Sequence, residues 1–281
     1  MDGGAREERS QLIVPEPAEA LAGLLDVSMP PAGYGDPLPP LWHWVYLLEH
    51  RRQSDLGPDG HPTHGVPEPP GAGRTRMFAG GRVTVLFPLR FGERAVQTTR
   101  LAKSVEKQGR SGQLTFATTR TEIRQQGSVA LVEEQDIVYR VQGSVLVGPA
   151  RHEAQGESGE ASRQETLLGL DVDPVVLFRF SALTYNAHRI HYDLPYVLSE
   201  GYPDLVVHGP LQALLMAEAF RRSGTPMRGK EFSYRLIAPT FGSQRMSVVR
   251  GIDDSAMTAL VRDAQGLITA TSAIRDVSPQ K

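Results

Sequence analysis

Apolar and polar residues alternate along four segments in the first half of the chain, as they do in strands with one covered face. One of these segments, LTFATTRTEIRQ at 114–125, is also rich in β-branched residues. The glycines of GRSG at 109–112 predict a tight hairpin. The sequence therefore predicts an antiparallel sheet, with strands at 82–88, 95–108, 114–125 and 129–141.

The second half combines one apolar helix with a second set of strands. A helical or irregular lead-in is expected over 175–186, and Pro210 suits the first position of a helix over 210–222. That helix is apolar on nearly every side and ends at Ser223-Gly224, which predicts that it is buried. The strands predicted to follow it span 231–238, 245–251, 256–263 and 267–275.

The first half repeats this plan less clearly. Helices are predicted over 17–25 and over 41–52 (LWHWVYLLEHRR), whereas 57–73 is too rich in Gly and Pro for regular structure. The order of elements predicts an α+β fold, in which an antiparallel sheet wraps a buried helix twice. We expect domains over 1–147 and 166–281, joined by the polar, Gly-rich linker 148–165.

Composition excludes several functions. The 281 residues carry a formal net charge of −2, which argues against nucleic acid as a partner. The chain has no cysteine, so disulfides, thiolate metal sites and cysteine nucleophiles are excluded. The charged N-terminus does not resemble a signal peptide, and no run approaches the ~20 apolar residues of a membrane span. We expect a cytoplasmic protein with no membrane partner.

Candidate chemistry is concentrated between residues 185 and 211. Asn186, His188 and His191 occur within one turn-rich segment, and His208-Gly209-Pro210 precedes the apolar helix. Histidine exchanges protons near neutral pH, and amide groups at a helix start can stabilise a carbonyl oxygen that gains negative charge. This pattern predicts an enzyme that moves a proton beside a polarised carbonyl.

Two of these segments carry a family resemblance. YNAHRIHYDLPY at 185–196 and GYPDLVVHGPL at 201–211 resemble the signature of the MaoC-like (R)-specific enoyl-CoA hydratases, which have the hot-dog fold. GDPLPPLWHWVYLL, RMFAGGRV and GRSGQLTF resemble the degenerate N-terminal hot dog of the same family. The resemblance implies a tandem hot-dog fold. Its two-domain form suggests a hydratase of itaconyl-CoA or 3-methylfumaryl-CoA that gives citramalyl-CoA. It further implies a coenzyme A thioester as substrate, no cofactor and a homodimer.

The resemblance also implies roles for individual residues. The family pattern G-D-x-N-P-x-H has Asp and His as its catalytic pair; here His191 takes the place of the His and Asn186 that of the Asp. An amide cannot accept a proton, so His191 is the expected general acid or base and Asn186 a positioning group. His188 and Asp193 are candidates to complete the chemistry.

The remaining candidates would bind the substrate. The amides of Gly209 and Leu211, beside His208, would meet the thioester oxygen, and Arg189 would meet a distant carboxylate. Further basic residues could bind the phosphates of coenzyme A, namely Arg74, Arg76, Arg82 and Arg110.

Structural explanations compete with these roles. Asp193 could only cap the turn before Pro195, and His208 could only precede a helix. His188 and His191 have the spacing of half a metal site, but no Glu or third ligand accompanies them, so no metal is expected. Three alternative functions stay open: a fatty enoyl-CoA hydratase or 3-hydroxyacyl dehydratase, a thioesterase that uses Glu218, and a non-catalytic acyl-CoA-binding module.

Overall fold

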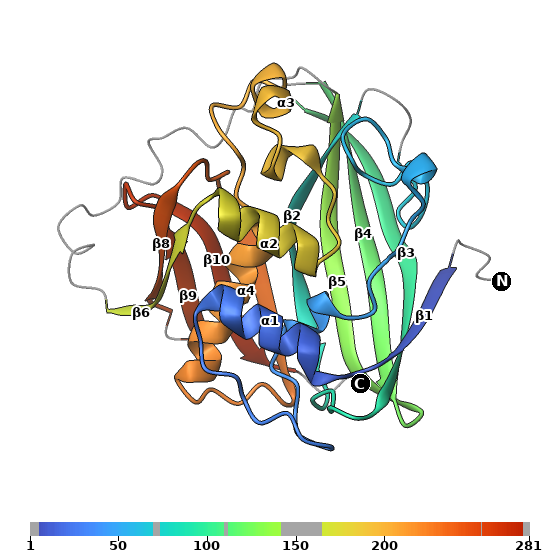
Figure 1. Ribbon diagram of the computed structural model, residues 1–281, viewed down its shortest axis with the longest axis vertical. Helices are drawn as coiled ribbons and strands as arrows, with labels where there is room; N and C mark the ends of the chain where they lie inside the picture. The colour runs from blue at the N-terminus through green and yellow to red at the C-terminus, as the bar shows by residue number, and fades with distance from the viewer. Residues whose placement is uncertain (1–5, 70–73, 110–111, 142–164, 254, 278–281) are drawn as a thin grey trace.

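One antiparallel sheet of ten strands forms the body of the protein in the computed structural model, which describes residues 6–69, 74–109, 112–141, 165–253 and 255–277. The strand order across the sheet is β1-β3-β4-β5-β2-β7-β10-β9-β8-β6, so each half of the chain contributes five neighbouring strands (Figure 1). The strands span Arg6–Leu12 (β1), Arg74–Val85 (β2), Arg94–Gly109 (β3), Gly112–Gln125 (β4), Ser128–Val141 (β5), Thr166–Val172 (β6), Lys230–Leu236 (β7), Gln244–Arg250 (β8), Met257–Arg262 (β9) and Ile268–Asp276 (β10).

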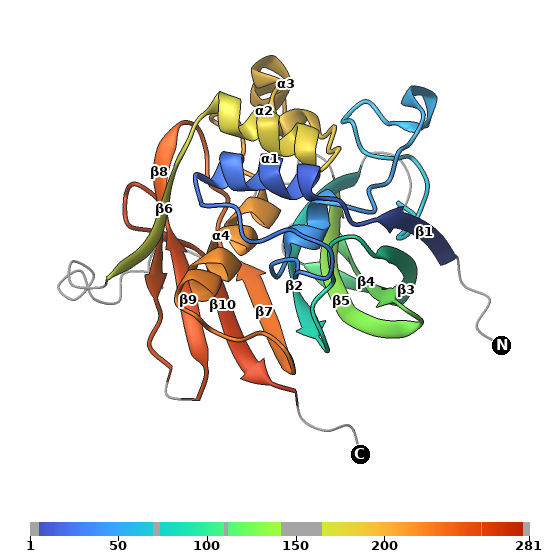
Figure 2. The same cartoon turned by 60° about the horizontal axis from the view of Figure 1, so that its bottom comes forward.

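The longest helix, α4, lies against the concave face of this sheet, and α1 and α2 lie side by side above it (Figure 2). All ten residues of α4 from Leu211 to Phe220 are buried, as its sequence predicts for a helix apolar on nearly every side. The helices span Pro15–Leu25 (α1), Pro174–Leu183 (α2), Leu194–Ser199 (α3) and Gly209–Arg222 (α4), with short 3₁₀ helices at Trp42–Val45 (η1), Gln53–Asp55 (η2) and Arg189–His191 (η4).

The two halves are joined where β2 pairs with β7. Their register runs from Gly80 opposite Arg235 to Val85 opposite Lys230. Gly80 has a φ of 154°, and a Cβ atom there would lie 2.4 Å from the carbonyl oxygen of Tyr234. Glycine is therefore required at this junction, which makes one sheet of the two halves.

We expect neither half to work alone. A fragment of residues 165–281 would expose the edge of β7, and exposed edges and uncovered apolar faces cause aggregation. A fragment of residues 1–150 would lack the segment that holds His188 and His191. Solubility and turnover of each fragment, expressed alone and together, measure this dependence. A soluble, fully active 165–281 fragment would contradict it.

Most elements lie where the sequence predicts them, but the helix expected over 41–52 is wrong. This segment forms only the four-residue η1, because Leu41 and Leu47 adopt left-handed φ angles of 64° and 55°. The amide of Leu47 donates to the side chain of Gln11, and the hydroxyl of Tyr46 donates to the carbonyl oxygen of Val14. Tertiary contacts thus replace the helical hydrogen bonds.

Other differences are smaller. Strands β1 and β6 were not predicted, and β2 begins eight residues before the expected start, at Arg74 rather than residue 82. The charged sequence REERSQL of β1 gives no apolar alternation to detect. Gly109 pairs with Gly112, which confirms the predicted hairpin, whereas the predicted linker lies outside the described residues except for residue 165.

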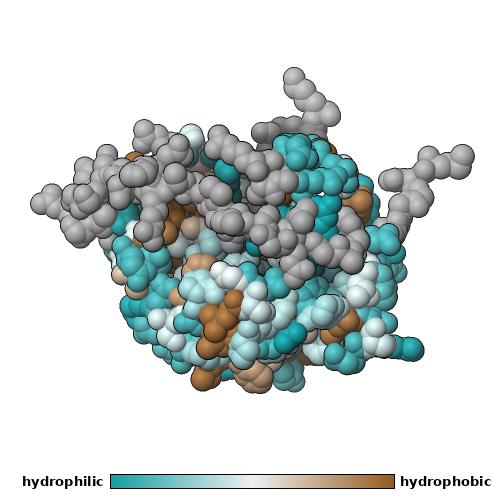
Figure 3. Space-filling model, turned by 90° about the horizontal axis from the view of Figure 1, so that it is seen from above, coloured by the Kyte–Doolittle hydropathy of each residue, from teal (hydrophilic) through white to brown (hydrophobic). Residues whose placement is uncertain are grey.

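The described surface in the view from above is mostly hydrophilic, with apolar residues in small groups (Figure 3). In the part of the chain that the structure describes, no helix is long and apolar enough to span a membrane.

Candidate active site

A pocket of about 960 Å³ opens at the N-terminal end of α4, where both halves of the chain meet. Its size is in the range of small-molecule sites. The C-terminal half contributes Asn186, His188, His191 and Gly209 to its walls. The N-terminal half contributes polar and apolar side chains that include His61, Arg76 and Phe78.

His191 presents a proton-accepting nitrogen in this pocket. Its Nδ1 lies 2.7 Å from the carbonyl oxygen of Val206, and because a carbonyl only accepts, Nδ1 carries the hydrogen. In the neutral ring, Nε2 therefore has the lone pair. Burial lowers the pKa of His191 to about 4, against the opposing effect of the Val206 hydrogen bond. At neutral pH His191 is thus uncharged and able to act as a base.

The ring of His208 packs against the ring of His191. The two rings stack with centroids 3.6 Å apart and planes 19° from parallel. His208 is fully buried, its Nε2 lies 2.9 Å from the hydroxyl oxygen of Ser181, and its side chain does not line the pocket. Burial keeps the pKa of His208 well below its usual value. This geometry orients the ring of His191 and does not bring His208 to a substrate.

Asn186 and His188 form a tight turn beside His191. The side-chain oxygen of Asn186 accepts a 3.0 Å hydrogen bond from the amide of His188. The amide nitrogen of the Asn186 side chain has no acceptor among the described residues, and Asn186 lines the pocket with His188. The His188 ring centroid lies 5.5 Å from that of His191, and burial lowers the pKa of His188. Asn186 can therefore donate to a bound water or substrate.

The start of α4 provides a backbone donor. Gly209 lines the pocket, and its amide has no acceptor among the described residues. A Cβ atom at this position would lie 2.2 Å from Cδ1 of Leu236, so a larger residue would displace the end of that side chain. The helix dipole adds positive potential at the same point. Leu211, also predicted as a donor, is buried and does not line the pocket.

Asp193 and Arg189 are bound to each other outside the pocket lining. The guanidinium of Arg189 donates to one carboxylate oxygen of Asp193 over 2.9 and 2.7 Å, and the other oxygen caps α3 by accepting from the amide of Tyr196 at 3.1 Å. The pKa of Asp193 is lowered chiefly by the Arg189 hydrogen bond. The predicted capping role is confirmed, and neither side chain lines the pocket.

A loop from the N-terminal half brings two unforeseen residues to the site. Arg189 donates its backbone amide to the carbonyl oxygen of Asp59 at 2.9 Å, and a Cβ atom at Gly60 would lie 1.9 Å from the carbonyl oxygen of Ala187. This close contact, at a φ of 88°, requires glycine. It places the His61 ring 3.9 Å from that of His188. The sequence feature that could have indicated these two residues is the occurrence of an Asp and a His within the Gly- and Pro-rich segment GPDGHPTHG.

Of the four arginines predicted for phosphate binding, Arg76 lines the pocket. It forms no hydrogen bond or ion pair with another described residue, but its charge lowers the pKa values of His61 and His188. Arg74 donates to Gln113 and Arg82 to Glu134, and Arg110 lies outside the described residues.

Within the described residues, one group has the spacing of a metal site: the ligand atoms of Asp59, His61 and His188 lie within 4.8 Å of one another. We do not assign a metal to it. Asp59 and His61 are already hydrogen-bonded to each other, at 3.0 Å, and the positive charge of Arg76 acts on both rings.

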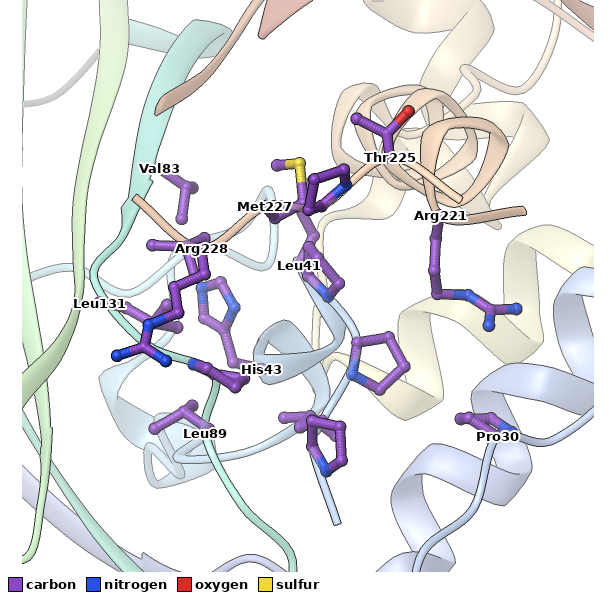
Figure 4. Close-up of a pocket in the computed structure, with 17 residues that line it drawn as sticks. Pro30, Leu41, His43, Val83, Leu89, Leu131, Arg221, Thr225, Met227 and Arg228 are labelled. Atoms are coloured by element: carbon purple, nitrogen blue, oxygen red, sulfur yellow. The ribbon is translucent and has the colours of Figure 1, made fainter. Parts of the chain in front are cut away.

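A second cavity, of about 350 Å³, lies near the C-terminal end of α4 (Figure 4). Leu41, Val83, Leu89 and Met227 line it, as do prolines, and its one histidine, His43, is hydrogen-bonded to buried Glu133 at 3.2 Å. The cavity offers apolar surface without an acid–base pair open to a ligand.

Glu218 is also placed away from the chemistry. Its carboxylate is fully buried and pairs with Arg221 over 2.7 and 2.6 Å. It does not line the larger pocket, so the acidic residue that a thioesterase would need is not supplied by Glu218.

Known structures resemble this fold over nearly the whole chain. HtdX of Mycobacterium tuberculosis has a TM-score of 0.68 at 15% identity, covering 97% of this chain and 100% of that one. A MaoC-like dehydratase from Phytophthora capsici has a TM-score of 0.67 at 14% identity and covers 98% and 96%. A protein of M. tuberculosis with a double hot-dog fold has a TM-score of 0.60 at 12% identity, covering 98% and 96%. The predicted tandem hot-dog fold is thus confirmed, because these structures share it over nearly the whole chain.

Sequence comparison identifies the family within that class. The model of the hydroxyacyl-thioester dehydratase type 2 family matches residues 41–242, and the chain belongs to this family. Mesaconyl-C(4)-CoA hydratase of Chloroflexus aurantiacus is 44% identical over 229 residues, 80% of this chain and 79% of that protein. The mitochondrial hydroxyacyl-thioester dehydratase type 2 of Schizosaccharomyces pombe is 27% identical over 235 residues, 75% and 77%. The protein is a hydro-lyase, a hydratase or dehydratase of acyl thioesters.

Proposed function

We propose that the protein adds water reversibly to 3-methylfumaryl-CoA, a short branched enoyl-CoA with a second carboxylate, to give citramalyl-CoA. The observation that carries this proposal is Arg76, a cation without a carboxylate partner among the described residues, beside the histidines of the pocket. A carboxylate on the β-carbon of the acyl group would lie next to the reacting atoms, where this charge is. The relative that is 44% identical, a mesaconyl-C(4)-CoA hydratase, supports the same substrate class.

The mechanism follows from the positions of three groups. Water held by the Asn186 amide gives a proton to Nε2 of His191 as its oxygen bonds to the β-carbon. The electron pair of the double bond moves toward the thioester oxygen, which gains enolate charge near the amide of Gly209. A proton then adds to the α-carbon, and the same steps in reverse remove water.

This chemistry favours 3-methylfumaryl-CoA over itaconyl-CoA. An enolate forms only when the double bond is conjugated with the thioester, as it is in the 3-methylfumaryl group. The double bond of the itaconyl group is one carbon further away. Acid–base groups and a backbone donor suffice for the proposed addition, so the proposal includes no metal or redox cofactor.

The test compares kcat/KM for 3-methylfumaryl-CoA, itaconyl-CoA, crotonyl-CoA and an octenoyl-CoA, followed by loss of the conjugated thioester absorbance or by product formation. We expect 3-methylfumaryl-CoA to exceed crotonyl-CoA by on the order of 10²-fold or more, because an uncharged substrate leaves Arg76 unpaired. Equal turnover of crotonyl-CoA or the octenoyl thioester would refute the charged-pocket proposal. Release of free thiol would instead indicate a thioesterase.

A further inference from the structure

Addition of water needs two proton transfers, one from water and one to the α-carbon, and the pocket contains a second acid–base group from the other half of the chain. His61 lines the pocket, and its ring Nδ1 lies 3.0 Å from a carboxylate oxygen of Asp59. The other oxygen of Asp59 accepts from the backbone amide of His61 at 2.9 Å. Because a carboxylate only accepts, Nδ1 carries a hydrogen and Nε2 is the nitrogen left for the substrate.

We propose that His61, oriented by Asp59, exchanges the proton at the α-carbon of the acyl thioester, whereas His191 exchanges the proton of water. This assignment rests on the proposed function and adds a catalytic residue to it. Asp59 is a positioning residue in this scheme, since its carboxylate acts through the ring of His61.

The unequal partners of the two histidines support this division of roles. A carboxylate stabilises an imidazolium more than a neutral carbonyl does, so Asp59 favours a proton on His61, and Val206 provides less support for a proton on His191. Groups whose environments separate their proton affinities divide into an acid and a base. Among the described residues, the charge of Arg76 lowers the pKa of His61, and the charge of His61 in turn lowers the pKa values of His188 and His191.

The steps balance as follows. In hydration, Nε2 of His191 takes a proton from water, the water oxygen bonds to the β-carbon, and the double-bond electrons move onto the thioester. The α-carbon then takes the proton from Nε2 of protonated His61, and the proton left on His191 returns to His61 through water in the pocket. In dehydration, neutral His61 removes the α-proton and protonated His191 gives its proton to the departing hydroxyl.

The docking of the loop keeps His61 in this position. The amide of Arg189 and the missing side chain of Gly60 hold residues 59–61 against the turn that contains His188. The side chain of His61 is 19% exposed, so the ring is held firmly yet reachable from the pocket. Precise support of this kind is what a catalytic group requires.

Deuterium exchange separates the two roles. Citramalyl-CoA and 3-hydroxybutyryl-CoA are incubated with the enzyme in D₂O, and incorporation at the α-carbon is measured beside dehydration. We expect His61→Gln to lose on the order of 10²-fold or more in both exchange and dehydration. We expect His191→Gln to lose dehydration by a similar factor while it keeps α-exchange within about tenfold of the wild type. Exposed His64, three residues along, gives the matched control His64→Gln, which should change neither.

The pH dependence of kcat/KM is a second test, because a purely structural role of Asp59 and His61 would leave it unchanged. Hydration needs neutral His191 and protonated His61, so kcat/KM should fall below pH values near the His191 pKa of about 4 and again above the pKa of His61. The pKa of His61 lies below its usual 6.5, because the effect of burial exceeds the opposing effect of the Asp59 carboxylate, which raises it. Asp59→Asn should therefore move the basic limb to lower pH and slow hydration by about tenfold or more.

Each outcome decides the assignment. Wild-type rates of α-exchange in His61→Gln, or an unmoved basic limb in Asp59→Asn, would overturn the role of His61 and leave the proposed function standing. If the wild-type enzyme neither exchanges nor dehydrates either thioester, the proposed function fails and this assignment fails with it. Circular dichroism and thermal melting of each variant confirm that the fold is retained.

Discussion

Replacement of His191 by Ala is expected to lower kcat/KM for hydration by about 10²–10⁴-fold, the usual contribution of a general acid or base. The expectation rests on three structural facts. The ring lines the pocket, Val206 holds its Nδ1 hydrogen at 2.7 Å, and burial keeps it neutral at pH 7 by lowering its pKa to about 4. An alanine removes the proton acceptor and leaves the water without a base.

The measurement is steady-state kinetics with 3-methylfumaryl-CoA, accompanied by thermal melting. His64→Ala is the control, because that ring is exposed and outside the pocket lining. Asn186→Ala should give a smaller loss than His191→Ala, of about tenfold, because its side chain offers a hydrogen bond and no proton acceptance. A folded His191→Ala protein with near-normal turnover would exclude His191 as the base.

The sequence predicts which segment of the C-terminal half reaches the pocket, because Asn186, His188 and His191 are close in chain order. It does not separate them from Arg189, Asp193, His208 and Leu211, which do not line the pocket. His191 and Gly209 lie eighteen residues apart in chain order, and the start of the helix at Gly209 follows from Pro210 and the apolar run after it. The apolar composition of 210–222 also predicts burial correctly, since a helix that is apolar on nearly every side buries that surface.

The N-terminal part could not be predicted because it depends on contacts between distant segments. The loop with His61 has no periodicity, and its place is set by Gly60 against Ala187. Arg189 pairs with Asp193, four residues along, at a spacing where opposite charges attract each other. Likewise, the left-handed φ angles of Leu41 and Leu47 and the hydrogen bond from Leu47 to Gln11 explain why the helix expected over 41–52 does not form.

Because of these contacts, both hot-dog halves of the chain contribute residues to the pocket. Asn186 offers no carboxylate, and a carboxylate held by the opposite half, Asp59, is hydrogen-bonded to a histidine of the same pocket. The N-terminal half therefore supplies more than a wall for the acyl group: in our proposal it supplies a proton donor and the charge that selects the substrate.

Substrate selection leads to the last prediction, for Arg76→Gln. We expect kcat/KM for 3-methylfumaryl-CoA to fall by on the order of 10²-fold, because hydrogen bonds to a charged group are worth roughly 1.5–3 kcal/mol. The value for crotonyl-CoA, which has no second carboxylate, should change little by comparison. Arg76→Lys should keep part of the preference, since a lysine supplies the charge but not the paired donors.

The informative quantity is the ratio of kcat/KM for the two substrates at one pH. Arg76 lowers the pKa values of His61 and His188, so its removal affects acid–base chemistry with either substrate, and this shared effect cancels in the ratio. Arg94→Gln, on the exposed surface of β3, is the control and should leave the ratio unchanged. An equal loss for both substrates in Arg76→Gln would show that the guanidinium does not recognise a carboxylate, and the dicarboxyl preference would need another cation.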